Sequence, residues 1–242
     1  MWSLYKKELK TFFSQLSGGL IIIFYLIANS AFLWLFSSDY NILDSGFAQM
    51  DGLFSLSPFI FLIFIPSLTM RLFSDEKKDG TIELLKTLPL SNLQLVLSKY
   101  LAGLSIVILA ISPTFIYYFS IYQLSEIVGN VDSAGIIGSY LGLILLASVF
   151  VSIGVFTSSI TKNQITSYVL AILISALFYL GFELIATEIV NGKLQLAIQF
   201  LGIDYHYMSL GKGLIDSRNV VYFISLNYIF IHLTVHRISK AI

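Results

Sequence analysis

The sequence predicts an all-α integral membrane protein with six transmembrane helices. Of its 242 residues, 57% are hydrophobic and only 12% are charged, whereas a soluble domain has about 25% charged residues. Six apolar runs also approach or exceed the ~20 residues that a helix needs to cross the hydrocarbon layer. They cover residues 18–36, 55–73, 98–122, 136–160, 165–187 and 219–236. We therefore treat residues 1–242 as a single membrane domain.

Residues 2–16, ahead of the first run, have the periodicity of an amphipathic helix. The apolar residues fall on one arc of a helical wheel with Leu4 as the exception, and the lysines lie elsewhere. The arc consists of Trp2, Tyr5, Leu9, Phe12, Phe13 and Leu16. Such a helix lies in the membrane interface, with its lysines towards anionic headgroups. A signal peptide is the alternative, but the apolar run that follows continues to Phe36, beyond the ~7–15 residues of a signal-peptide core.

The distribution of basic residues among the loops predicts the orientation of the spans. Of the 14 basic residues, only Lys193, Lys212 and Arg218 lie in the loops assigned to one side. The loop 37–54 on that side contains aspartates and no basic residue. Because cytoplasmic loops carry the excess of Lys and Arg, we expect both termini and residues 71–99 to be cytoplasmic.

The most extended polar stretch, residues 71–91, joins the second and third runs. Asp79-Gly80 is a turn dipeptide, residues 81–88 have the length of about two helical turns, and Pro89 cannot continue a helix. Ser91, with Gln94 after it, predicts a capping box at the start of the next helix. The stretch therefore predicts a short helix between two spans.

This short helix carries both apolar and charged side chains. Its apolar residues are Ile82, Leu84, Leu85 and Leu88. The charged residues 75–79 are simply solvated in one interpretation, but charged rims around an apolar anchor are also typical of transient interfaces. Because the helix has little to bury within its own subunit, we expect it to face a soluble partner protein.

The loop 188–218 is not a plain polar linker, because residues 194–203 are largely apolar and glycines punctuate the rest. Two short re-entrant helices in the outer leaflet, before the last span, explain this pattern, since irregular backbone at membrane depth must be buried in protein or lie beside water. An interfacial helix with no role in gating is an equal alternative.

Three polar residues lie within the apolar runs. Asn29 and Asn227 are near the middle of the first and last runs, and Glu183 is near the outer end of the fifth. They line a transport pathway or an interface between subunits, or the asparagines bond a neighbouring helix at a net worth of about 1 kcal/mol. For Glu183 the alternative is a hydrated or backbone-bonded group near the interface. Helix packing is the commoner case for the two asparagines.

Catalytic chemistry has little support in the sequence. The phosphate-binding motif G-x-x-x-x-G-K-[ST] is absent, because Gly211-Lys212-Gly213 lacks the upstream glycine and the hydroxyl residue. The chain has no cysteine, which excludes disulfides and cysteine metal sites. The net charge is zero, which gives no support for nucleic-acid binding. We expect no catalytic residue, cofactor or metal, although copper or zinc binding by His206 stays open.

The stretch 71–91 resembles the cytoplasmic loop of ABC-2 type transporter permeases, in which a charged cluster precedes the pattern G-T-[IL]-E-x-L-x-x-x-P-[IL]-S. Here the pattern is formed by Gly80, Thr81, Ile82, Glu83, Leu85, Pro89, Leu90 and Ser91. In that family the short helix is the coupling helix, which rests in a groove of the ATP-hydrolysing subunit. The resemblance therefore implies docking of a separate ABC ATPase through Glu76, Gly80, Thr81, Ile82, Glu83, Leu84, Leu85, Leu88 and Pro89.

The resemblance also implies a second permease subunit, identical or homologous, in the cytoplasmic (inner) membrane of a bacterium. Within the family the chain looks most similar to gliding-motility-associated permeases, the Gld-type F subunit, and to permeases of nitrous-oxide-reductase clusters. Residues 201–222, with His206 and Gly213 to Asp216, carry this narrower match. The implied function is export for gliding motility or the cell surface.

Two other classes of function remain as alternatives. A stand-alone secondary transporter or channel requires inverted repeats and charges at the membrane midplane, and the sequence has neither. A membrane scaffold without transport, in a motility or secretion complex, is the other alternative.

Overall fold

The computed structural model describes residues 1–242 except 39, 45, 48, 88, 212–215 and 241–242. The secondary structure of the described residues is helical, and six helices are long and apolar enough to cross a membrane. These are Gly18–Leu35, Asp51–Lys78, Asn92–Leu124, Ser133–Ile160, Gln164–Thr187 and Ser217–Lys240. The predicted fold class, all-α with six spans, is confirmed.

Several spans consist of more than one helical segment. In chain order the elements are α1 (Trp2–Ser14), α2 (Leu16–Ser30), η1 (Ala31–Leu35), α3 (Asp51–Thr69), α4 (Arg71–Lys78), α5 (Ile82–Lys86), α6 (Asn92–Ile111), η2 (Ser112–Thr114), α7 (Phe115–Leu124), α8 (Ser133–Ile160), α9 (Gln164–Ala176), η3 (Leu177–Gly181), α10 (Phe182–Thr187), α11 (Gly192–Gln199), α12 (Ile203–Leu210) and α13 (Ser217–Lys240). Pro113 lies in the 3₁₀ turn η2 that separates α6 from α7. A proline lacks the N–H for the α-helical ladder, so the third span changes its helix type there.

Helix α8 is the centre of the bundle. It packs against α3, α4, α6, α9, α12 and α13. Small residues on α8 allow these close approaches: a Cβ at Gly142 would lie 3.3 Å from Leu210 of α12, and a Cβ at Gly154 would overlap Thr69 of α3. Association of membrane helices depends on this kind of backbone proximity, because lipid is as apolar as the side chains.

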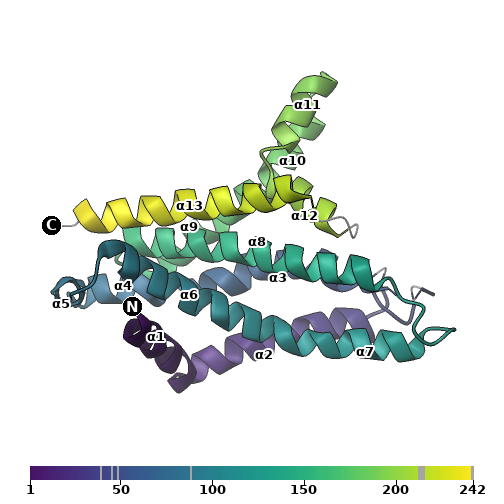
Figure 1. Ribbon diagram of the computed structural model, residues 1–242, viewed down its shortest axis with the longest axis horizontal. Coiled ribbons are helices and arrows are strands. Elements are labelled where there is room, and N and C mark those ends of the chain that lie inside the picture. Colours follow the sequence, from purple (N-terminus) through teal and green to yellow (C-terminus); the bar gives the residue numbers. More distant parts are fainter. Residues whose placement is uncertain (39, 45, 48, 88, 212–215, 241–242) are drawn as a thin grey trace.

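The two chain ends and α5 lie at the same end of the bundle (Figure 1). An even number of spans requires the termini to be on one side, and the structure has that arrangement. The connection between α8 and α9, which contains Lys162, also follows the end of α8 on this side. The basic residues that the sequence assigned to one side are therefore at one end of the molecule.

Helix α1 runs across the bundle axis rather than along it (Figure 1) and packs against α6 and α2. Leu4, the residue outside the predicted apolar arc, is buried, whereas Trp2 and Phe13 from that arc are exposed. The exception has a physical reason: Leu4 faces the protein, and the exposed aromatic residues face the surroundings. An amphipathic helix in this position suits a membrane interface.

Helices α10 and α11 form a hairpin that projects from the side of the bundle (Figure 1). Exposed apolar residues lie on both helices and at the turn between them, among them Leu184, Leu196 and Val190. Helix α12 returns to the bundle and packs against α8 and α13. The two short helices predicted before the last span are thus present. Helix α11 lies in the projecting hairpin, and α12 lies against the bundle.

Replacing Gly154 with alanine is expected to destabilise the protein by about 1–3 kcal/mol, because the new methyl group overlaps Thr69 in a packed interior. Thermal unfolding of the purified protein in detergent measures the effect. The double variant Gly154→Ala/Thr69→Ala should recover part of the loss. Gly19→Ala is the control: a Cβ there meets no atom within 4 Å, so its stability should stay level or rise by up to about 1 kcal/mol.

Candidate functional site

The helix that follows the second span carries the charged residues of the stretch 71–91. The sequence placed the end of that span near Phe73, but α4 continues as a helix from Arg71 to Lys78. The helix therefore extends beyond the predicted apolar run. Several of its polar side chains bond residues of neighbouring helices.

At the junction between α3 and α4, a serine of α8 forms hydrogen bonds with the backbone. Ser158 Oγ accepts hydrogen bonds from the backbone N–H groups of Phe73 (2.9 Å) and Ser74 (3.0 Å). The same hydroxyl donates to the carbonyl of Met70 at 2.9 Å. A side chain inserted into the hydrogen-bond ladder is an established cause of a helix kink. The direction of α4 is consequently fixed by α8.

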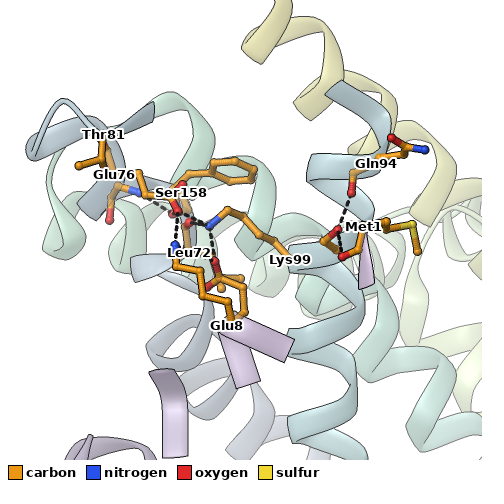
Figure 2. Close-up of polar contacts among 12 residues, drawn as sticks. Met1, Glu8, Leu72, Glu76, Thr81, Gln94, Lys99 and Ser158 are labelled. Atoms are coloured by element: carbon orange, nitrogen blue, oxygen red, sulfur yellow. Dashed lines mark hydrogen bonds and ion pairs between the residues drawn. The ribbon is translucent and has the colours of Figure 1, made fainter. Parts of the chain in front are cut away.

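Lys99 lies at the centre of an ion cluster that joins three helices (Figure 2). Its ammonium group donates to Glu8 Oε1 of α1 at 2.9 Å and to Glu76 Oε1 of α4 at 2.8 Å. The third hydrogen bond goes to the carbonyl of Leu72, and the Phe73 ring lies 5.0 Å from the nitrogen. The side chain is only 1% exposed. All three ammonium donors of this buried lysine are therefore satisfied.

Helix α4 is also tied to the connection between α8 and α9. Gln164 donates to Asp75, and Lys77 donates to the carbonyl of Ser159. The charged cluster is thus neither a freely solvated run nor only the rim of an interface, because three of its side chains hold α4 to other helices. These bonds hold α4 to α8 and α9 in addition to the contacts with Lys99.

Helix α5 covers Ile82–Lys86, shorter than the predicted range 81–88. Gly80 before it has a φ of +71°, a left-handed conformation that favours glycine and confirms the predicted turn. The N–H of Thr87 bonds back to Glu83, and α5 ends there, before Pro89. Leu88 lies outside the described residues.

The two faces of α5 differ in exposure. Ile82 and Leu85 are half-buried and pack against the core, so the expectation that this helix buries little within its own subunit is wrong for these two. Leu84 is 67% exposed, and Glu83, Thr81 and Pro89 are also exposed. One apolar side chain of α5 thus points away from the bundle.

The next helix, α6, begins with the predicted capping box, since the Ser91 side chain and Gln94 bond each other's backbone N–H.

The two asparagines within spans bond neighbouring helices. Asn29 of α2 is fully buried, donates to the carbonyl of Tyr25 and accepts a hydrogen bond from Ser57 of α3. Asn227 of α13 donates to Ser148 of α8 at 2.8 Å. These contacts account for both residues as packing groups within the subunit. A role in a pathway or a subunit interface stays a prediction.

Glu183 of α10 accepts a hydrogen bond from Gln199 of α11 at 3.3 Å and so helps to hold the hairpin. Its charge also acts on Asp204 of α12. Burial raises the pKa of the Asp204 carboxyl above its usual range, the Glu183 charge raises it further, and a hydrogen bond with Tyr179 opposes the shift. The structure thus places Glu183 near a second acid.

His206 has partners at both ring nitrogens: Nδ1 is 2.7 Å from Asn219 Oδ1, and Nε2 is 2.9 Å from the carbonyl of Phe200. Its ring stacks on Tyr222 with the centroids 3.9 Å apart. Within the described part of the chain, no three acidic or histidine side chains are placed to hold a metal ion. Gly213 to Ile215, which belong to the narrower resemblance, lie outside the described residues.

Sequence reasoning missed Lys99 and Glu8 as parts of this site. Lys99 is the second residue of a predicted span, and a cation within a span is costly unless it is paired. Its position therefore indicated a paired, functional lysine. Its partners lie 91 and 23 residues away in the sequence. No local pattern identifies pairs at such separations.

Comparison with known proteins gives one family. The family model described as ABC-2 family transporter protein matches residues 2–232. A comparison with curated protein sequences found no match. The matched region contains α1, the α4–α5 segment and all six spans up to the last turns of α13.

Replacing Lys99 with methionine is expected to destabilise the protein by about 3–5 kcal/mol, because it leaves two partly buried carboxylates without their common cation. Thermal unfolding in detergent measures the loss. Lys78→Met, at an exposed position of the same segment, is the control and should stay within about 0.5 kcal/mol of the parent. The triple variant Lys99→Met/Glu8→Gln/Glu76→Gln should be more stable than Lys99→Met alone. Equal stability of Lys99→Met and the control would contradict the assigned role.

Proposed function

Because the chain belongs to the ABC-2 family of transporter proteins, we propose that it is the permease subunit of an ATP-driven exporter and that a separate ATPase docks on α5. The multi-pass chain supplies the membrane path, and the ATPase supplies the energy. The observation that carries this proposal is the geometry of α5: Ile82 and Leu85 hold it to the bundle, while Leu84 and Glu83 face outwards.

The connections of α4 support a mechanical role for α5. Helix α4 is bonded to α1 and α6 through Glu76 and Lys99, and to α8 through Ser158. A displacement of α5 is therefore transmitted through α4 to the centre of the bundle as a movement of connected rigid elements. ATP binding closes the ATPases and favours the outward-open arrangement, which is a population shift by a ligand with unequal affinity for two states.

The α10–α11 hairpin supports a complex with a second permease subunit, identical or homologous. The hairpin stands away from the bundle, and Val190 at its turn is fully exposed. A second bundle beside the first would cover apolar residues on both helices. The path for substrate then lies between the two permeases, where the predicted pathway residues Asn29, Asn227 and Glu183 remain to be tested.

The resemblance to Gld-type permeases supports export for gliding motility or the cell surface, from the cytoplasmic membrane of a bacterium, with both termini cytoplasmic. The basic end of the bundle, which contains both termini and α5, agrees with this orientation under the positive-inside rule. A non-transporting scaffold is the second candidate, and an ATPase partner unable to hydrolyse ATP separates the two. If function persists with that partner, transport is not the role.

Leu84→Asp is expected to abolish co-purification of the ATPase subunit, because it places a charge on the exposed apolar position of α5. The measurement is the ratio of ATPase to permease after affinity purification from the source cells. Leu84 is a sharper test than Leu85, whose partial burial couples it to the fold. The matched control is Leu43→Asp, which changes an exposed leucine in the loop after the first span. An undiminished ratio in Leu84→Asp removes α5 as the docking element.

Val190→Cys is expected to form a cross-link to a second permease chain in native membranes. The protein contains no other cysteine, so a bifunctional thiol reagent reports on this position alone. A homodimer gives a product of two identical chains, and a heterodimer gives a product only with a homologue that carries a nearby thiol. Ile127→Cys, exposed in the loop before α8, is the comparison. Equal cross-linking at both positions would contradict an interface at the hairpin.

A further inference from the structure

A cavity of about 190 Å³ lies between α1, the α3–α4 junction, α6 and the first turns of α2. This volume has room for on the order of ten water molecules, far more than a single ion requires. One side of the cavity is apolar, with Phe12, Ile21, Leu68 and Ile106 in its lining. The other side is polar and charged. The cavity thus suits a ligand that is itself part apolar and part charged.

The charges that line the cavity have both signs. Lys7 and Arg71 contribute the cations, and Glu8, Asp75 and Glu76 contribute the anions. Lys99, bonded to Glu8 and Glu76, brings the formal charge of the group to zero. A group that offers both cations and anions can contact both charges of a zwitterion, whereas a plain anion or a plain cation contacts favourably only the residues of opposite sign.

The carboxylate of Glu76 has capacity for a further donor. Its Oε1 is 2.8 Å from Lys99 Nζ and 3.8 Å from Lys7 Nζ. Its Oε2 is buried and accepts no hydrogen bond from the residues that the structure describes. A buried carboxylate oxygen without a donor is costly, so this atom favours a ligand that carries N–H groups.

The character of α1 indicates that the cavity lies at the depth of lipid headgroups. Helix α1, which forms one wall, crosses the bundle axis and exposes Trp2 and Phe13, as expected of a helix in the membrane interface. The apolar lining residues Ile21 and Ile106 belong to α2 and α6, which extend from the cavity into the bundle. A lipid headgroup can therefore occupy the polar side while its acyl chains follow the apolar side.

We propose that this cavity binds a phospholipid whose headgroup combines a phosphate with a primary ammonium, such as phosphatidylethanolamine. The ammonium donates to Glu76 Oε2, and the phosphate accepts from Arg71 and Lys7, the cations of the lining. A primary ammonium has three N–H donors, whereas a trimethylammonium headgroup has none. The lipid bridges α1 and α4 beside the Lys99 cluster. The inference goes beyond the proposed function and does not depend on the ATPase.

Native mass spectrometry of the full chain, released from detergent with added lipid, tests this proposal. Phosphatidylethanolamine should be retained about tenfold more than phosphatidylcholine with the same acyl chains, because only the former supplies donors to a charged acceptor. It should also be retained more than phosphatidylglycerol. Retention of phosphatidylethanolamine equal to that of either other lipid would overturn the proposal. Soluble phosphoethanolamine should compete weakly, and full displacement by it would show a site for a free headgroup, which also overturns the lipid assignment.

Two variants locate the site. Thr11→Phe introduces a ring at an exposed position of α1 that lines the cavity, and it should abolish the preference for phosphatidylethanolamine. Thr11→Val, which keeps the size of the side chain, should retain that preference. Glu76→Gln should lower the preference several-fold, even if its stability falls with the loss of the ion pair. Undiminished preference in Thr11→Phe would place the lipid elsewhere and refute the site. Leu84→Asp should retain the preference, so failure of ATPase docking and failure of lipid binding are distinguishable.

Discussion

The arrangement of α1 and α4 depends on the ion pairs of the buried ammonium group of Lys99. A cation that is 1% exposed can persist only if its charge is compensated and its donors are satisfied. Glu8 and Glu76 provide the compensation, and they come from two helices that are otherwise separate in the chain. The same bonds that solvate the lysine therefore also determine where α1 and α4 lie. Removal of one partner leaves the others in an unfavourable environment, which makes the cluster a strict constraint on geometry.

This constraint gives α4 a defined position between α5 and the centre of the bundle. Helix α4 is held by Lys99 of α6, by Ser158 of α8 and by Gln164 of α9. Helix α5 continues from it through the turn at Gly80 and exposes Leu84. An element that joins α5, the proposed docking helix, to a firmly held helix is what the transmission of movement from an ATPase requires. Flexible connections would dissipate such a movement before it reached α8.

The part of the molecule away from α4 and α5 is organised differently. There the polar groups are mostly hydroxyls and amides, such as the bonds of Asn29 with Ser57 and of Asn227 with Ser148. These bonds are modest in membrane proteins, because an unfolded helix in lipid also finds partners. The α10–α11 hairpin leaves the bundle altogether and keeps its apolar side chains exposed. Charged bonds hold the helices together around α4, whereas neutral bonds join the spans at these asparagines.

The sequence by itself determined the class of fold and several local elements. Six spans follow from six apolar runs, because every backbone polar group in lipid must bond within its own helix. The turn at Gly80 and the capping box at Ser91 follow from residues within a few positions of each other. Only the tertiary structure decided that α4 continues to Lys78, that Leu4 faces the protein, and that Glu8, Glu76 and Lys99 meet. These outcomes depend on contacts between residues far apart in the chain, and neither helical periodicity nor hydropathy contains that information.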